Sequence, residues 1–255
     1  MKSSKIKSII ISLLITLSFV FVIGVISSVF VMSLSDYESY MSFISGAAQL
    51  IYLAAAVLIL KIRKNNITKK YNLSAIPLTE YVIPIGAGFC FSVFSNILQT
   101  ILPIPEFLAG EAGETFGASI IAFIAAIYII APFTEEFVFR GLIMTRVRRT
   151  MGAFSSVCIS AVLFGAIHLM TGSAVTVVHA LLGGLIFGLA YEKTGSLFAA
   201  MAAHLAGNLG GLISYVDLNI SVKITAVILS GTASLLLCLL LIKKKSKLQE
   251  KIQEE

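Results

Sequence analysis

The chain has 255 residues, of which 58% are hydrophobic and only 13% are charged, and its mean hydropathy of +0.97 lies far outside the balance of a soluble domain. The formal net charge of +6 does not indicate a nucleic-acid partner, because the basic residues are confined to short segments between apolar runs. Composition therefore predicts a multi-pass protein of the cell membrane that contacts the lipid bilayer and no nucleic acid. The three cysteines lack a C-x-x-C spacing, so they indicate neither a disulfide framework nor a thiolate metal site.

Eight segments carry the roughly 20 mostly apolar residues that a membrane-spanning helix needs. In chain order they cover residues 9–34, 40–60, 81–102, 116–145, 153–170, 174–191, 197–215 and 220–242. The first follows a lysine-rich start but is too long for a cleaved signal peptide, so we expect it to be retained. No linker, repeat or low-complexity tract divides the segments. We therefore expect an all-α transmembrane helix bundle that forms a single integral-membrane domain over residues 1–255.

The distribution of charge tests this partition independently. If the N-terminus is cytoplasmic, every Lys and Arg falls in a cytoplasmic segment except Arg140, inside the fourth span, and Lys223. Acidic residues such as Asp36, Glu106 and Asp217 fall in the opposite loops. This positive-inside bias predicts that both termini are cytoplasmic. The lysine-rich tail after residue 242 is expected to help fix that topology and to be available to anionic lipid.

The fourth segment holds two adjacent carboxylates and a guanidinium, Glu135, Glu136 and Arg140. A charged side chain at the centre of a bilayer costs about 2.5 to 3.5 kcal/mol on insertion scales, so such residues are functional by default. Residues four apart share a helix face, so we expect Glu136 to pair with Arg140. Glu135 is rotated by about 100° from Glu136 and is expected to point elsewhere. The alternative is a purely structural ion-pair cluster near Pro132.

Later segments add His168, His204 and Asn208. With a rise of about 1.5 Å per residue, these side chains and Glu135 all reach a similar depth near the middle of the bilayer. A glutamate, two histidines and an amide are the parts needed for hydrolysis by an activated water, with the glutamate as general base and donors for the oxyanion. Glu135, His168 and His204 also suit a zinc ion. The sequence leaves open whether the cofactor is one zinc ion or none.

Other types of catalytic centre fit this sequence poorly. No H-E-x-x-H motif is present, the aspartates Asp36 and Asp217 fall in loops, and there is no nucleophile elbow, P-loop or dinucleotide fingerprint. His179 matches no motif and is expected to pack or to form a hydrogen bond. The glycine pairs 184/188 and 207/211 are spaced four apart, which predicts close approach of helices in lipid.

The ordered set Glu135-Glu136-x-x-x-Arg140, Phe164-x-x-x-His168 and His204-x-x-x-Asn208 resembles the three motifs of the CPBP family of intramembrane proteases. This is the CAAX-protease and bacteriocin-processing group, also called Abi. The glycine-rich stretch 183–196 is similar to the run that the family carries between its second and third motifs. The resemblance covers residues 116–215, which form the predicted motif-bearing catalytic core.

The resemblance implies an intramembrane endopeptidase that hydrolyses a membrane-associated peptide or protein. By the same resemblance, Glu135 with His168 would activate water, and His204 with Asn208 would stabilise the oxyanion. Both a metal-dependent and a metal-free, glutamate-activated mechanism have been put forward for this family. A prenylated C-terminus, a bacteriocin leader, a signalling-peptide precursor and a membrane-bound regulator are all compatible substrates.

The resemblance also implies that Glu136 and Arg140 brace the site. Two further function classes stay open. In the first alternative, the chain is a catalytically silent scaffold or bacteriocin-immunity protein that uses the same fold to bind a membrane peptide. A transporter or proton relay also buries Glu and His, but the two halves of the chain lack the paired broken helices typical of transporters.

Overall fold

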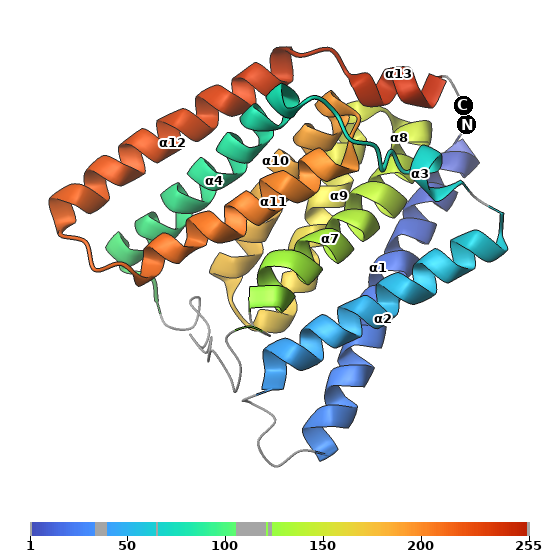
Figure 1. Ribbon diagram of the computed structural model, residues 1–255, viewed down its shortest axis with the longest axis horizontal. Coiled ribbons are helices and arrows are strands. Elements are labelled where there is room, and N and C mark those ends of the chain that lie inside the picture. Colours follow the sequence, from blue (N-terminus) through green and yellow to red (C-terminus); the bar gives the residue numbers. More distant parts are fainter. Residues whose placement is uncertain (1, 34–39, 65, 106–120, 122–123, 254–255) are drawn as a thin grey trace.

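The computed structural model describes residues 2–33, 40–64, 66–105, 121 and 124–253, and every regular element among them is a helix (Figure 1). The long helices are α1 (Lys2–Ser33), α2 (Met41–Ile62), α4 (Leu78–Ile101), α9 (Ala153–Ile167), α10 (Ala174–Thr194), α11 (Leu197–Gly211) and α12 (Ile220–Lys243). Within the described ranges, seven helices are long and apolar enough to cross a membrane. The predicted all-α architecture is confirmed, and the protein is a multi-pass membrane protein.

The fourth predicted segment is more irregular than its sequence suggests. Its first residues, 116–120 and 122–123, lie outside the described residues, as do loop residues 106–115. The described part runs through η2 (Ala125–Ile130), α7 (Ala131–Glu136), η3 (Phe137–Met144) and α8 (Thr145–Met151), and η2 and η3 are π-helical. Pro132 cannot donate the backbone hydrogen bond of a continuous helix, and the hydrogen-bond pattern changes from π to α next to it. Such π stretches are rare and often mark functional sites.

Short helices that the hydropathy pattern did not predict lie at the ends of the long ones. They are α3 (Ile67–Lys70), the 3-10 turns η4 (His168–Thr171) and η5 (Leu212–Tyr215), and α13 (Lys247–Gln253). The first described residues of α1 and the end of α13 lie at the same end of the bundle (Figure 1).

The lysine-rich tail packs on the protein instead of standing free for lipid. Lys244 and Lys247 each lie 2.9 Å from the carboxylate of Glu80 at the start of α4. Lys251 donates to the carbonyl of Gly195, at 2.7 Å, in the turn between α10 and α11. Three lysines of the tail therefore bond to the protein, whereas Lys243 and Lys245 are exposed, and contact of the tail with anionic lipid stays a prediction.

Large apolar side chains cover the outside of the bundle, as expected of a protein whose solvent is lipid, and its apolar interior also holds a few buried polar side chains. Glu136 and Arg140 are completely buried, whereas Phe21 is 69% exposed and Leu78 is 85% exposed. Helix α4 packs against α11 and α12, and α9 packs against α10. Figure 1 shows these five helices on one side of α7, and α1 and α2 on the other. The fourth segment therefore runs through the middle of the bundle.

Small residues set the tightest helix contacts, as expected where lipid removes the hydrophobic driving force. A Cβ atom on Gly184 would lie 3.2 Å from the Ala161 backbone, and one on Gly188 would lie 3.1 Å from Val157, so this predicted pair does permit close approach. In the 207/211 pair the nearest atoms lie at 3.6 Å, an ordinary contact. The closest approach between α4 and α11 is instead at Gly88, where a Cβ would lie 2.2 Å from the Ala203 carbonyl oxygen.

We expect Gly88→Ala to separate α4 from α11, because the new methyl group would meet backbone that cannot move aside. Overpacking of this kind costs about 2 kcal/mol or more. Thermal unfolding of the purified protein in detergent micelles measures the loss. Gly24→Ala is the matched control, because no atom lies within 4 Å of the position of its Cβ. Equal midpoints for the two variants would contradict this account of the α4–α11 contact.

Candidate active site

Arg140 and Glu136 form a completely buried ion pair at the centre of the bundle. The Arg140 Nη1 donates to Glu136 Oε1 at 2.8 Å, the pairing that a spacing of four residues predicts. The Nη2 of the same guanidinium donates to the carbonyl oxygen of Gly184 on α10, also at 2.8 Å. The pair thus ties the fourth segment to α10, and a side chain on Gly184 would come within 3.2 Å of Nη2.

Two aromatic rings complete the environment of the guanidinium. The Arg140 Cζ lies 4.8 Å from the ring centroid of Phe164 on α9 and 5.5 Å from that of Phe187 on α10. Cation–π contacts of this kind are stronger in a desolvated site than at a surface. Phe187 also stacks on the imidazole of His204, with centroids 4.5 Å apart and an interplanar angle of 14°.

His204 lies between the two glutamates. Its Nδ1 is 3.0 Å from Glu136 Oε1, and its Nε2 is 3.8 Å from Glu135 Oε2. An ionised carboxylate only accepts, so Nδ1 donates to Glu136 and the opposite edge of the ring faces Glu135. Glu136 accepts from both Arg140 and His204, whereas the contact of Glu135 with His204 is longer than a hydrogen bond.

Glu135 and His168 form the more open part of the site. The Glu135 side chain is 12% exposed, while that of Glu136 is 0% exposed. His168 follows the last residue of α9, and its Nδ1 lies 2.9 Å from the carbonyl oxygen of Phe164. A carbonyl only accepts, so Nδ1 carries the proton and a neutral His168 keeps Nε2 as an acceptor. The Phe164 ring contacts both histidines edge-on, with its centroid 4.9 Å from that of His168 and 5.6 Å from that of His204.

Asn208 lies one turn beyond His204 on α11, and its amide nitrogen donates to the carbonyl oxygen of Ile127 in η2 at 2.9 Å. An amide nitrogen carries two N–H groups, and this bond uses one of them. His179 is placed differently from the motif histidines. Its Nδ1 lies 2.8 Å from the hydroxyl of Ser95 on α4, which agrees with the hydrogen-bonding role expected of it.

The arrangement does not fit a metal ion. Among the described residues, no group of three or more His, Cys, Asp or Glu side chains is placed to hold one. Glu136 Oε2 is buried without a hydrogen-bond partner in that part of the chain, but its neighbouring oxygen already contacts the buried Arg140 guanidinium. A divalent cation there would be repelled by the guanidinium at short range. As placed in this structure, Glu135, His168 and His204 do not form such a group, and their role as metal ligands stays a prediction.

The sequence did not point to Phe187 or to the carbonyl of Gly184 as parts of this site. Both lie within the glycine-rich stretch 183–196, and Gly184 had been assigned to packing alone. The sequence did hold one signal: Gly184 lies about one turn before Phe187, on a helix next to the segment that carries the buried Arg140. The packing assignment is right, and the same close approach exposes a carbonyl to the guanidinium.

Comparison with known families bears on the same stretch of the chain. Residues 117–210 match the family model described as type II CAAX prenyl endopeptidase Rce1-like. This segment is Rce1-like. The predicted resemblance is confirmed, since all three motifs lie within the Rce1-like segment, and this match supports a CAAX-type intramembrane protease. No curated protein and no solved structure matches the chain.

We expect Arg140→Ala to destabilise the protein by about 3 kcal/mol or more, because it leaves the Glu136 carboxylate buried without its cation. The double variant Arg140→Ala with Glu136→Gln should recover part of that loss, since the unpaired charge is then removed. Denaturant unfolding in mixed micelles measures both. If Arg140→Ala unfolds like the parent chain, the bracing role is wrong.

Proposed function

We propose that the chain is an intramembrane endopeptidase of the CAAX-protease type that hydrolyses a peptide bond of a membrane-associated peptide or protein. The observation that carries this proposal is the division between two adjacent glutamates. Glu136 is fully buried and bonded to Arg140 and His204, whereas Glu135 is partly exposed and lies beyond hydrogen-bond distance of His204. One carboxylate is fixed by the protein, and its neighbour is available to a substrate water.

Glu135 is the general base in this proposal. It takes one proton from a water molecule as the water oxygen bonds to the scissile carbonyl carbon. His168 supports this step through Nε2, which its Phe164 contact leaves as an acceptor in the neutral ring. When the carbon–nitrogen bond breaks, the protonated Glu135 returns that proton to the leaving nitrogen. Water is consumed, and an acid and an amine are formed.

His204 and Asn208 stabilise the oxyanion of the tetrahedral intermediate. Because Nδ1 of His204 donates to Glu136, Nε2 can donate only from a doubly protonated ring, for which Glu136 is the nearest counter-charge. Asn208 offers its second N–H while the first holds Ile127. Donors aimed at developing charge in a dry site are typically worth about 3 kcal/mol each. No step in this scheme requires a metal ion.

We expect Glu135→Gln to abolish cleavage while the protein stays folded, because the amide keeps the shape of the carboxylate but cannot take the proton. Membrane peptides from cells that carry the parent chain and the variant are compared by mass spectrometry, with unfolding measured on the same preparations. Glu80→Gln is the matched control, since this carboxylate lies at the start of α4 and pairs with Lys244 and Lys247 of the tail.

Products that persist with Glu135→Gln would refute the assignment of the base. Identical peptide profiles for the parent chain and Glu135→Gln would favour the silent scaffold instead. Metal analysis of the purified parent chain completes the test. One zinc ion per chain, together with loss of activity on chelation, would contradict the metal-free mechanism.

A further inference from the structure

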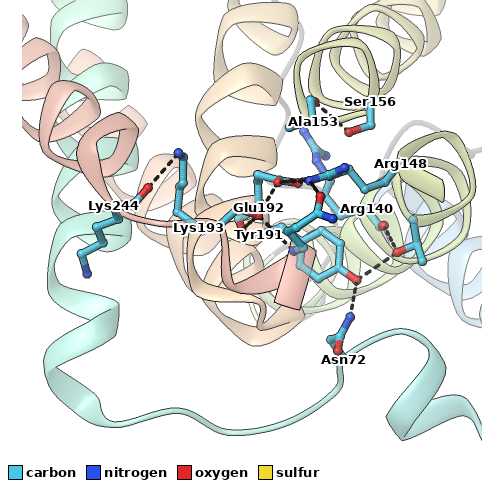
Figure 2. Close-up of polar contacts among 12 residues, drawn as sticks. Asn72, Arg140, Arg148, Ala153, Ser156, Tyr191, Glu192, Lys193 and Lys244 are labelled. Atoms are coloured by element: carbon cyan, nitrogen blue, oxygen red, sulfur yellow. Dashed lines mark hydrogen bonds and ion pairs between the residues drawn. The ribbon is translucent and has the colours of Figure 1, made fainter. Parts of the chain in front are cut away.

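The hydroxyl of Tyr191 lies at a buried junction between three parts of the chain. Tyr191 is at the end of α10 nearest the termini and is completely buried. The Asn72 amide donates to its oxygen at 3.2 Å, and the Thr145 hydroxyl lies 2.9 Å away. Thr145 Oγ1 in turn donates to the carbonyl of Arg140 at 3.1 Å. Figure 2 shows Tyr191 reaching from α10 with Asn72 on one side and Arg140 beyond.

The number of protons gives this chain of hydrogen bonds a direction. Each hydroxyl has one proton to donate. Thr145 gives its proton to the Arg140 carbonyl, so Tyr191 must donate to Thr145, and Tyr191 receives from Asn72. The carbonyl of Tyr71 is a second acceptor for Tyr191 at 3.3 Å, a longer contact. The donors therefore run from Asn72 through Tyr191 and Thr145 to Arg140.

The end point of this chain is the π-helical stretch that carries Arg140. The Arg140 carbonyl also accepts the backbone N–H of Thr145, five residues later, which is the bond that defines a π turn. Thr145 thus supplies two donors to one carbonyl. An α-helical turn would instead direct that carbonyl to the N–H four positions later, and would shift the backbone that follows Arg140 relative to α10.

Asn72, the first donor in this series of hydrogen bonds, is also held in place. Asn72 lies in the α3–α4 loop (residues 71–77) with a φ of 54°, a left-handed conformation that asparagine tolerates better than most residues. Its carbonyl accepts the N–H of Leu197 at 3.0 Å, and the Ser196 hydroxyl donates to the Ser74 carbonyl at 2.7 Å. The first turn of α11 therefore holds the loop in place. The loop itself lies outside the segment that matches the family.

We propose that Asn72, Tyr191 and Thr145 are positioning residues for the active site. Their hydrogen bonds hold the π turn that follows Arg140 and tie its backbone to α10, the helix whose Gly184 carbonyl accepts from the Arg140 guanidinium. Arg140 in turn holds Glu136, which bonds His204. Through them the α3–α4 loop, in the half of the chain without a family motif, controls the geometry of catalysis. The catalytic part of this inference rests on the proposed function.

Thr145 offers the sharpest test, because Thr145→Val removes the hydroxyl at nearly constant shape and Thr145→Ser keeps it. The probe is a quenched fluorescent peptide with a farnesylated C-terminal Cys-aliphatic-aliphatic-X motif, in phosphatidylcholine vesicles that contain the full chain. We expect Thr145→Val to lower kcat about tenfold with KM unchanged, and Thr145→Ser to stay within about threefold of the parent chain.

Tyr191→Phe should match Thr145→Val, because it removes the preceding donor. Asn72→Gly keeps the left-handed backbone while removing the amide, and should lower kcat less, because Tyr191 can still donate to Thr145. Ser234→Ala is the matched control, since the buried Ser234 hydroxyl bonds the Ala87 carbonyl between α12 and α4. A change in KM alone, or equal loss with Thr145→Ser, would overturn the positioning role.

Hydrogen exchange of backbone amides supplies a readout that does not depend on cleavage. Thr145→Val and Tyr191→Phe should raise exchange at residues 137–145 at least tenfold while leaving α12 unchanged. Unchanged exchange in both variants would refute the chain of hydrogen bonds even if activity fell. If the parent chain and Glu135→Gln show the same peptide profiles, the proposed function fails, and exchange still decides whether these residues hold the π turn.

Discussion

Arg140 carries its charge into a core where neither lipid nor apolar side chains can solvate it, and the contacts that stabilise the guanidinium join the fourth segment to α9 and α10. Glu136 supplies the counter-charge from the same segment, and the Gly184 carbonyl supplies an acceptor from α10. Phe164 on α9 and Phe187 on α10 present their faces to the guanidinium. Helix α11 joins through His204, which bonds Glu136. The need to satisfy one buried cation therefore sets how the helices around the site are assembled.

The packing of the bundle follows the same constraint. The carbonyl of Gly184 can reach Arg140 because the residue has no side chain, and a methyl group there would press on Phe164 and Ala161. Small residues thus allow close helix contact, and close contact turns a backbone carbonyl into a ligand for the guanidinium. In lipid, where apolar burial does not drive helices together, polar contacts of this kind also contribute to association.

The sequence predicted the helices well because uninterrupted apolar runs of sufficient length have few alternatives in a membrane. It also predicted the Glu136–Arg140 pairing, since a spacing of four residues survives the change from α to π geometry. The π stretches themselves were not predictable from hydropathy, because hydropathy does not record whether a backbone carbonyl accepts from the residue four or five positions later. The partners of Phe187 and Asn208 come from other helices, and one sequence carries no record of such contacts. The docking of the lysine-rich tail was missed for the same reason, since Glu80 lies far away in the chain.

The division between the two glutamates follows from charge. Glu136 and Arg140 cancel each other at 2.8 Å, so the pair adds little net field to the dry interior. Glu135 is then the carboxylate of the motif that has no guanidinium in direct contact, and in the proposed mechanism the histidines are the groups that assist its proton transfer. If Glu135 were bound to Arg140 instead, the carboxylate at the more open position would be held by a permanent cation and would be a poor base. The order of the motif therefore decides which of two adjacent acids lacks a cation in direct contact, and in the proposed mechanism that acid faces the substrate.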